Sequence, residues 1–121
     1  MTQTPIILTG ARIHDGHRLH DDVVLQITAD GSAAIQPAAN AGKGSRLALD
    51  EGIIIPGFVD LQVNGGDGIM FNDAPTLETL RRIARAHWSL GCAAILPTLI
   101  TDTPAKTQAA IDATIAAIKE Q

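Results

Sequence analysis

The sequence has few aromatic residues and only one cysteine. Its 121 residues include one Trp, two Phe and no Tyr, so a hydrophobic core must be built from aliphatic side chains and alanine. The single cysteine, Cys92, excludes an internal disulfide bond and fits a reducing compartment. No apolar run has membrane-spanning length, and residues 1–5 lack the features of a signal peptide. We therefore predict a cytoplasmic protein that does not bind a membrane.

Positive charge is also scarce. Nine Lys and Arg residues stand against thirteen Asp and Glu residues, which gives a formal net charge of −4. This balance offers no basic surface to a polyanion, so we predict that nucleic acid is not a partner. Because 45% of the residues are hydrophobic, the chain can still build a modest core.

The first part of the chain has the pattern of short strands separated by turns. Asp15-Gly16 and Asp30-Gly31 are turn signals, and residues 37–45 are small and polar. The pattern predicts an antiparallel meander, which would form a small, sandwich-like β-domain over residues 1–55. The predicted strands cover residues 6–13, 23–27, 32–36, 46–50 and 53–55.

The segment that organises the rest is residues 53–68, IIIPGFVDLQVNGGDG. Side chains along a strand alternate between two faces, so one face carries Val59, Leu61 and Val63. The other face carries a polar row, because Asp60, Gln62 and Asn64 follow Phe58 on it. Polar groups in a sheet need a partner or a ligand, which makes Gln62 and Asn64 candidate site residues.

A helix, a strand and a second helix are predicted after the glycine-rich loop. Thr76 is a suitable N-cap and Gly91 a suitable stop for the first helix. Residues 92–96 are continuously apolar, as is typical of a buried parallel strand, and Thr103-Pro104 begins the second helix. The predicted class is therefore α/β.

The helical patterns also predict which side chains are buried. The apolar face of the second helix is predicted to carry Ile111, Ile115 and Ile118. On the first helix, Trp88 is predicted to pack in the core and His87 to lie on the surface.

Two β/α units cannot close a barrel or form a covered parallel sheet. A complete (β/α)8 barrel of the TIM type typically needs about 250 residues. We therefore expect residues 56–121 to be the first two β/α units of such a barrel, incomplete in this chain. The chain would then be the front end of something larger, or would complete itself by association with further copies as a homo-oligomer.

Residues 56–66, PGFVDLQVNGG, resemble the first barrel strand of the amidohydrolase superfamily, whose usual pattern is P-G-[FLI]-[IV]-D-x-H-x-H. Gln62 and Asn64 stand at the two histidine positions. This replacement, with the Asn-Gly-Gly loop, is similar to the N-acetylglucosamine-6-phosphate deacetylase family. The resemblance continues through residues 68–73, 89–92 and 96–101, and the N-terminal strands resemble the family's small β-domain.

The resemblance implies metal-dependent hydrolysis of an amide bond, in which N-acetylglucosamine 6-phosphate, a sugar phosphate, gives glucosamine 6-phosphate and acetate. It implies a divalent metal, zinc or a similar ion, that activates a water, and an aspartate that transfers protons. The family's metal ligands are a glutamate after the third barrel strand and two later histidines. We therefore expect the ligands and the catalytic residues beyond Gln121, none in this chain, and an inactive isolated chain. Only Gln62 and Asn64 match active-site positions, as lining residues.

The chemistry of these two amides predicts a site with one metal. An amide oxygen is a weaker zinc ligand than an imidazole nitrogen, so replacing both histidines should remove one metal position. Alternatively, Gln62 and Asn64 tie down loops at the strand end. For the whole chain, the other interpretations are a different amidohydrolase, or a non-catalytic remnant or binding module that self-associates.

Other polar residues have structural interpretations. Asp60 is expected to bond to backbone or to a neighbouring strand. The glycine loop makes a tight connection more readily than a phosphate cradle, and Thr98 suits a capping or turn role. Three histidines around the first turn, His14, His17 and His20, are expected to be solvated rather than to hold a metal.

Overall fold

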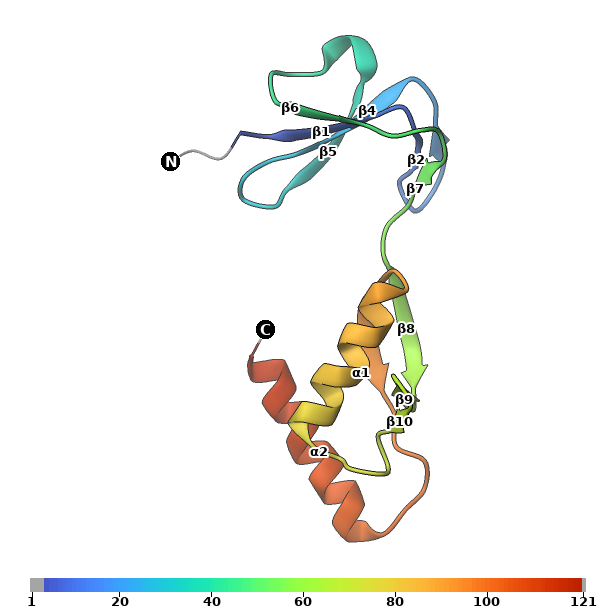
Figure 1. Cartoon of the computed structure of the whole chain (residues 1–121), viewed down its shortest axis with the longest axis vertical. Coiled ribbons are helices and arrows are strands. Elements are labelled where there is room, and N and C mark those ends of the chain that lie inside the picture. The colour runs from blue at the N-terminus through green and yellow to red at the C-terminus, as the bar shows by residue number, and fades with distance from the viewer. Residues whose placement is uncertain (1–3, 121) are drawn as a thin grey trace. The chain divides into compact units, whose positions relative to one another are not determined.

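The computed structural model describes residues 4–120. The chain divides into two compact units, Met1–Pro56 and Gly57–Gln121 (Figure 1). The class is mixed α/β, as the sequence predicts. In the part of the chain that the structure describes, the first unit contains seven strands and a 3-10 helix, and the second contains four strands and both α-helices. Within residues 4–120, neither helix has the length and hydrophobicity needed to cross a membrane.

The first unit contains two small sheets. A four-stranded sheet has the order β5-β4-β1-β6, and a three-stranded sheet has the order β3-β2-β7. Buried residues in this unit are Ile7, Ile13 and Val24. The strands are β1 (Ile6–Thr9), β2 (Arg12–His14), β3 (Leu19–His20), β4 (Val23–Ile27), β5 (Ala33–Pro37), β6 (Ser45–Ala48) and β7 (Ile53–Ile54), with a 3-10 helix at Ala38–Asn40 between β5 and β6.

Two predictions for this unit were wrong. The predicted strand over residues 6–13 breaks at Gly10, whose φ is +86°, so β1 and β2 belong to different sheets. The topology is also not a pure antiparallel meander, because β6 pairs with β1 and β7 pairs with β2 in parallel. The chain between β5 and β6 carries β6 to the far edge of β1, and such a crossover leaves no local signal in the sequence.

The second unit is built from a β/α/β/α sequence. Its strands β8 (Phe58–Val63) and β11 (Cys92–Pro97) pair in parallel, as predicted. A short hairpin, β9 (Gly65–Gly66) and β10 (Ile69–Met70), follows β8. The helices are α1 (Leu77–Ser89) and α2 (Pro104–Lys119).

The predicted helix ends are confirmed. The Thr76 hydroxyl accepts a hydrogen bond from the Thr79 amide at 3.2 Å, and the Thr103 hydroxyl accepts one from the Lys106 amide at 3.4 Å. Each hydroxyl satisfies one amide that has no partner within the first helical turn. Gly91, with a φ of +93°, turns the chain from α1 into β11.

The core of the second unit lies between the strands and the helices. Two corrections concern the helical faces. The isoleucines of α2 (Ile111, Ile115 and Ile118) are exposed, and the alanine face of this helix is buried instead. The core side chains are Val63, Phe71, Leu80, Ile83, Ala110 and Ala113.

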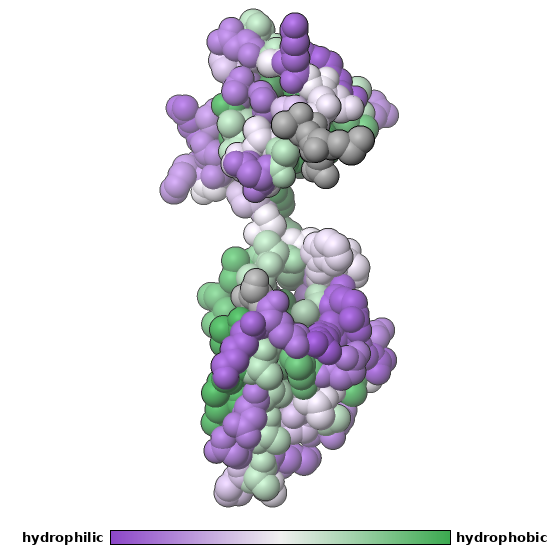
Figure 2. Space-filling model, turned by 90° about the vertical axis from the view of Figure 1, so that its left-hand side faces the viewer, coloured by the Kyte–Doolittle hydropathy of each residue, from purple (hydrophilic) through white to green (hydrophobic). Residues whose placement is uncertain are grey.

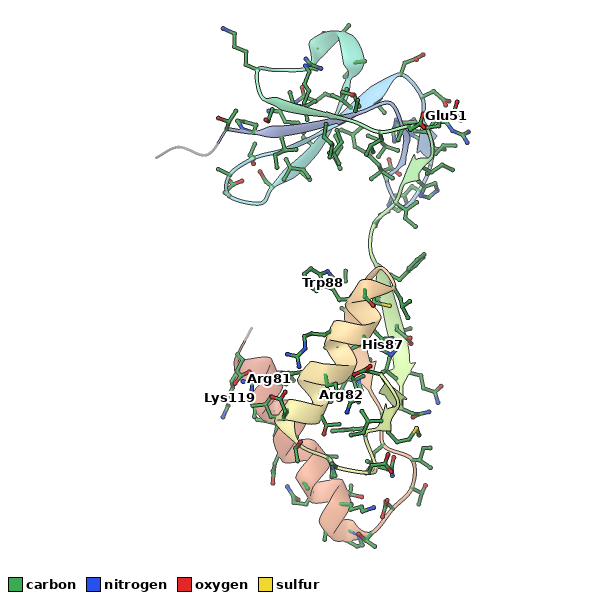
Figure 3. The ribbon with its side chains drawn as sticks, viewed as in Figure 1. Glu51, Arg81, Arg82, His87, Trp88 and Lys119 are labelled. Atoms are coloured by element: carbon green, nitrogen blue, oxygen red, sulfur yellow. The ribbon has the colours of Figure 1, made fainter. Side chains whose placement is uncertain are left out.

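Trp88 and His87 are also placed opposite to the prediction. Trp88 is 76% exposed, whereas the His87 side chain is only 18% exposed. Figure 3 shows the two side chains leaving α1 in different directions, with His87 on the side near β8. The buried stripe of α1 is centred on Leu80 and Ile83, which turns His87 inward and Trp88 outward.

Much of the strand surface in this unit is uncovered. Leu61 of β8 is 69% exposed and Leu96 of β11 is 48% exposed. The exposure of Leu96 shows that the prediction of a buried strand over residues 92–96 was wrong for this chain by itself. Figure 2 shows hydrophobic surface, coloured green, along one side of the unit. Two strands and two helices supply too few layers to cover every apolar face.

Candidate functional site

The candidate site lies where the two parallel strands end. Asn64 directly follows β8 and Thr98 directly follows β11. The Thr98 amide donates to the carbonyl oxygen of Val63 at 2.9 Å, and its hydroxyl donates to Asn64 Oδ1 at 2.5 Å. The amide oxygen of Asn64 is therefore engaged, and its nitrogen is the group that can donate to another molecule.

Gln62 is exposed on the same strand. Its backbone amide donates to Asp60 Oδ1 at 3.1 Å, while its side chain has no hydrogen-bond partner within residues 4–120. The structure thus brings Asn64 and Thr98 together, and leaves the Gln62 amide free to bind water or a ligand.

Asn72 joins the loops beside this edge. Its Nδ2 donates to the Ile100 carbonyl oxygen at 2.8 Å and to Asp102 Oδ2 at 3.0 Å, and its Oδ1 accepts from the Ile100 amide at 3.0 Å. These bonds hold the loop after β11 against the segment after β10. The hydrogen bond from Asn72 lowers the pKa of Asp102 below its ordinary value, with further help from the Thr103 amide and from Lys106. Sequence reasoning did not assign this role to Asn72, since its partners lie about thirty residues away.

The glycine-rich loop is a tight hairpin. Asp67 and Gly68 both have positive φ, as in the two-residue turns that fit hairpin twist. A Cβ on Gly65 would lie 2.9 Å from Met70 Cα, so this position needs glycine. Arg82 binds the turn, because its guanidinium donates to the carboxylate and to the carbonyl oxygen of Asp67 at 2.5 and 2.6 Å. These contacts support the structural interpretation of the loop.

A second group of polar side chains lies between β8, α1 and β11. It contains Asp60, His87 and Cys92, which are each partly buried. Asp60 Oδ2 lies 3.6 Å from His87 Nδ1, and His87 Nε2 lies 3.0 Å from the Gly65 carbonyl oxygen. The sequence interpretation missed this group because it placed His87 on the surface. The close spacing of His87 and Cys92 around a helix end was the available signal.

The three N-terminal histidines do not gather. His20 Nε2 lies 2.6 Å from Asp15 Oδ2, and His14 Nδ1 accepts from the Gly16 amide at 3.1 Å. The hydrogen bond with His20 holds the pKa of Asp15 well below its usual range. Among residues 4–120, the group of Asp60, His87 and Cys92 is the one that could supply three ligands to a metal.

Known proteins similar to this chain include two amino-sugar-6-phosphate deacetylases. No protein-family model matches the chain. Over 70 residues it is 54% identical to an N-acetylgalactosamine-6-phosphate deacetylase of Shewanella sp. (strain ANA-3). This match covers 58% of the chain and 18% of that relative. Over 81 residues it is 36% identical to an N-acetylglucosamine-6-phosphate deacetylase of Haemophilus influenzae, covering 66% of the chain and 21% of that relative. Over these stretches the chain is similar to two amino-sugar-6-phosphate deacetylases.

Two solved structures of deacetylases contain the fold of this chain. N-acetylglucosamine-6-phosphate deacetylase from Pasteurella multocida matches 97% of the chain with a TM-score of 0.88 and 24% identity, and the match spans 31% of that structure. A mutant of the Mycobacterium smegmatis enzyme, solved in complex with N-acetyl-D-glucosamine 6-phosphate, matches 97% with a TM-score of 0.83 and 24% identity, over 30% of its length. The chain thus spans about a fifth of the curated relatives and about three tenths of the solved structures.

Proposed function

We propose that this chain is the N-terminal part of a metal-dependent deacetylase that acts on N-acetylated amino sugar 6-phosphates. The observation that carries the proposal is sequence identity of 54% and 36% to two deacetylases, together with a matching fold over 97% of the chain. In this proposal residues 1–55 are the small β-domain, and residues 56–121 are the first two β/α units of a TIM-type barrel. The parallel pairing of β8 and β11, with a helix after each strand, supports this assignment.

The proposed reaction converts N-acetylglucosamine 6-phosphate to glucosamine 6-phosphate and acetate. A second candidate is the same reaction on the galactosamine isomer, and it is favoured by the 54% identity to the Shewanella protein. The two sugars differ only in the configuration of one hydroxyl group, so both place an acetamide and a phosphate at the same positions.

The proposed roles of Gln62 and Asn64 are to line the active site. Both lie at the carboxyl end of β8, which is where barrel enzymes hold their substrates. They do not suit a metal site, because amide oxygens are weak ligands and Asn64 Oδ1 already accepts from Thr98 at 2.5 Å. Asn64 would instead donate through its nitrogen, and Gln62 would bind water or substrate with its free amide.

The divalent metal in this proposal is a single ion. Its ligands are expected beyond Gln121, and when bound it would supply an activated water for attack on the acetamide carbonyl. Within the chain, Asn72 and Thr98 would act as positioning residues, since they fix the loop and the side chain that border the site.

The test is a chimera with a complete relative. This chain replaces the matching segment of the Haemophilus influenzae deacetylase, and acetate release is measured with both sugar phosphates. We expect turnover by the chimera and none by the purified 121-residue chain. Within the chimera, Asn64→Ala should lower kcat/KM by about tenfold or more, since a hydrogen bond to substrate is lost. Thr101→Ala is the matched control and should leave the rate unchanged.

Different outcomes separate the competing functions. A folded chimera without activity on either sugar would favour another amidohydrolase. Turnover by the isolated chain would overturn the expectation that its chemistry needs residues beyond Gln121. Stable assembly of the isolated chain without activity in the chimera would favour a self-associating binding module. A homo-oligomeric enzyme located in the cytoplasm is part of the same proposal.

A further inference from the structure

Three side chains from three different elements converge in the second unit. Asp60 lies in the middle of β8, His87 near the end of α1, and Cys92 at the start of β11. One ligand atom from each lies within 4.8 Å of the other two. We propose that Asp60, His87 and Cys92 form a binding site for a zinc-like transition-metal ion.

The hydrogen bonds around the group orient its ligand atoms. His87 Nε2 donates to the carbonyl oxygen of Gly65 at 3.0 Å, which leaves the lone pair on Nδ1. Nδ1 faces Asp60 Oδ2 at 3.6 Å, while Asp60 Oδ1 accepts from the Gln62 amide at 3.1 Å. A histidine that ligates a metal commonly donates its other nitrogen to a carbonyl oxygen or carboxylate in this way.

The distances are close to those of a bound ion. Tetrahedral zinc holds nitrogen and oxygen at about 2.0–2.2 Å and sulfur at about 2.3 Å, which places two ligand atoms roughly 3.3–3.6 Å apart. The separation of His87 Nδ1 from Asp60 Oδ2 already fits, at 3.6 Å. The Cys92 sulfur needs only a small rotation, since all three atoms lie within 4.8 Å.

The ligand types select the ion. A thiolate and an imidazole favour zinc or cobalt, whereas magnesium and calcium prefer oxygen ligands alone. Three protein ligands leave a fourth position for water. The site is partly buried, and Asp60 and Cys92 belong to one parallel ladder, in which Cys92 pairs with Phe58 and Ile95 with Asp60.

This site is a different set of residues from the ligands that the deacetylase resemblance places beyond Gln121. It therefore stands or falls independently of the proposed function. Without a metal, the same contacts would only pair Asp60 with His87 and hold the glycine hairpin through Gly65. Cys92 distinguishes the two cases, because its sulfur has no part in the contacts between Asp60, His87 and Gly65 but would ligate a metal.

The experiment is a cobalt(II) titration of the purified, reduced 121-residue chain. Cys92 is the only cysteine, so a thiolate-to-cobalt charge-transfer absorption can come only from this site. We expect the absorption to saturate at one cobalt per chain, with visible bands of tetrahedral intensity, and to disappear when zinc is added. A folded, reduced chain that develops no such absorption would overturn the proposal.

Variants assign the other two ligands. Cys92→Ser should abolish the charge-transfer band, and Asp60→Asn and His87→Gln should each weaken cobalt binding by about tenfold or more. His17→Gln, the same change at an exposed histidine of the first unit, should leave binding unchanged. Binding by His87→Gln that equals the parent would contradict a three-residue site.

A measurement without variants guards against misfolded mutants. The rate at which Cys92 reacts with an alkylating reagent is followed with and without one equivalent of zinc. We expect zinc to slow the reaction by about tenfold or more, and a chelator to restore it, because the bound thiolate is no longer a free nucleophile. An unchanged alkylation rate would overturn the proposal.

Discussion

The hydroxyl of Thr98 donates a hydrogen bond to Asn64 Oδ1 at 2.5 Å, across 34 positions of sequence. The bond joins the carboxyl ends of β8 and β11, the edge at which barrel enzymes place their active sites. It fixes the orientation of the Asn64 amide, because an oxygen that already accepts leaves the nitrogen to point elsewhere.

Thr98→Val should therefore destabilise the second unit. It leaves Asn64 Oδ1 partly buried without its donor, at a cost of about 1–2 kcal/mol in the free energy of unfolding. Urea denaturation followed by the helical circular-dichroism signal reports on this unit, since both α-helices lie in it. Thr101→Val changes an exposed threonine in the next loop and is expected to have little effect. Equal costs for the two variants would contradict the role assigned to this bond.

Asn72→Ala should have a larger effect than Thr98→Val. Three hydrogen bonds to Ile100 and Asp102 are lost together, and at about 0.5–1.5 kcal/mol each the expected loss of stability is about 2–3 kcal/mol. Asn40→Ala, in the 3-10 helix of the first unit, serves as the matched control in the same urea experiment. A loss of stability smaller than that of Thr98→Val would show that the hydrogen bonds of Asn72 contribute little.

Acid should weaken the second unit through Asp102. Its pKa is lowered in the fold, chiefly by the hydrogen bond from Asn72. A lowered pKa means that this contribution to stability is complete above the ordinary aspartate pKa of about 3.9, and is lost as the pH falls below it. The melting temperature of Asp102→Asn should therefore fall less than that of the parent between pH 6 and pH 3. Asn72→Ala should also make the fall in melting temperature between pH 6 and pH 3 smaller than in the parent. If the parent and Asp102→Asn lose the same melting temperature over this range, Asp102 is not the source of the acid sensitivity.

The sequence predicted what local signals encode. Thr76, Gly91 and Thr103 mark helix ends through hydrogen bonds or backbone angles a few residues away, and all three assignments are confirmed. The polar row of β8 drew attention to Gln62 and Asn64 because strand alternation is also local.

Partners that are distant in sequence could not be predicted in this way. Periodicity predicted that the isoleucine face of α2 packs, but the alanine face is buried instead, because small side chains allow close approach. The bond between Asn64 and Thr98, and the convergence of His87 with Asp60, depend on the pairing of β8 with β11 and on the rotation of α1. Such relations require the assembled fold.

Gly65→Ala should destabilise the glycine hairpin. An added Cβ would lie 2.9 Å from Met70 Cα and still closer to the Ile69 carbonyl oxygen, so β9 and β10 would have to separate. The expected cost is about 1–3 kcal/mol in the free energy of unfolding. Gly68→Asn, at a turn position with a φ of +73° and open space around it, should cost less than about 1 kcal/mol. A reversed order would contradict the close approach at Gly65.

The exposed apolar faces of the second unit predict that the isolated chain self-associates. Ile111, Ile115 and Leu61 are each about half exposed or more, and apolar surface of this extent is normally covered by a partner. In a complete barrel further β/α units would cover it; alone, the chain can bury it only against another copy. Analytical ultracentrifugation should therefore detect concentration-dependent oligomers. The double variant Ile111→Lys, Ile115→Lys should shift the equilibrium toward monomer, whereas Ala105→Lys, on the exposed first turn of α2, should not. A parent chain that stays monomeric at high concentration would contradict this prediction.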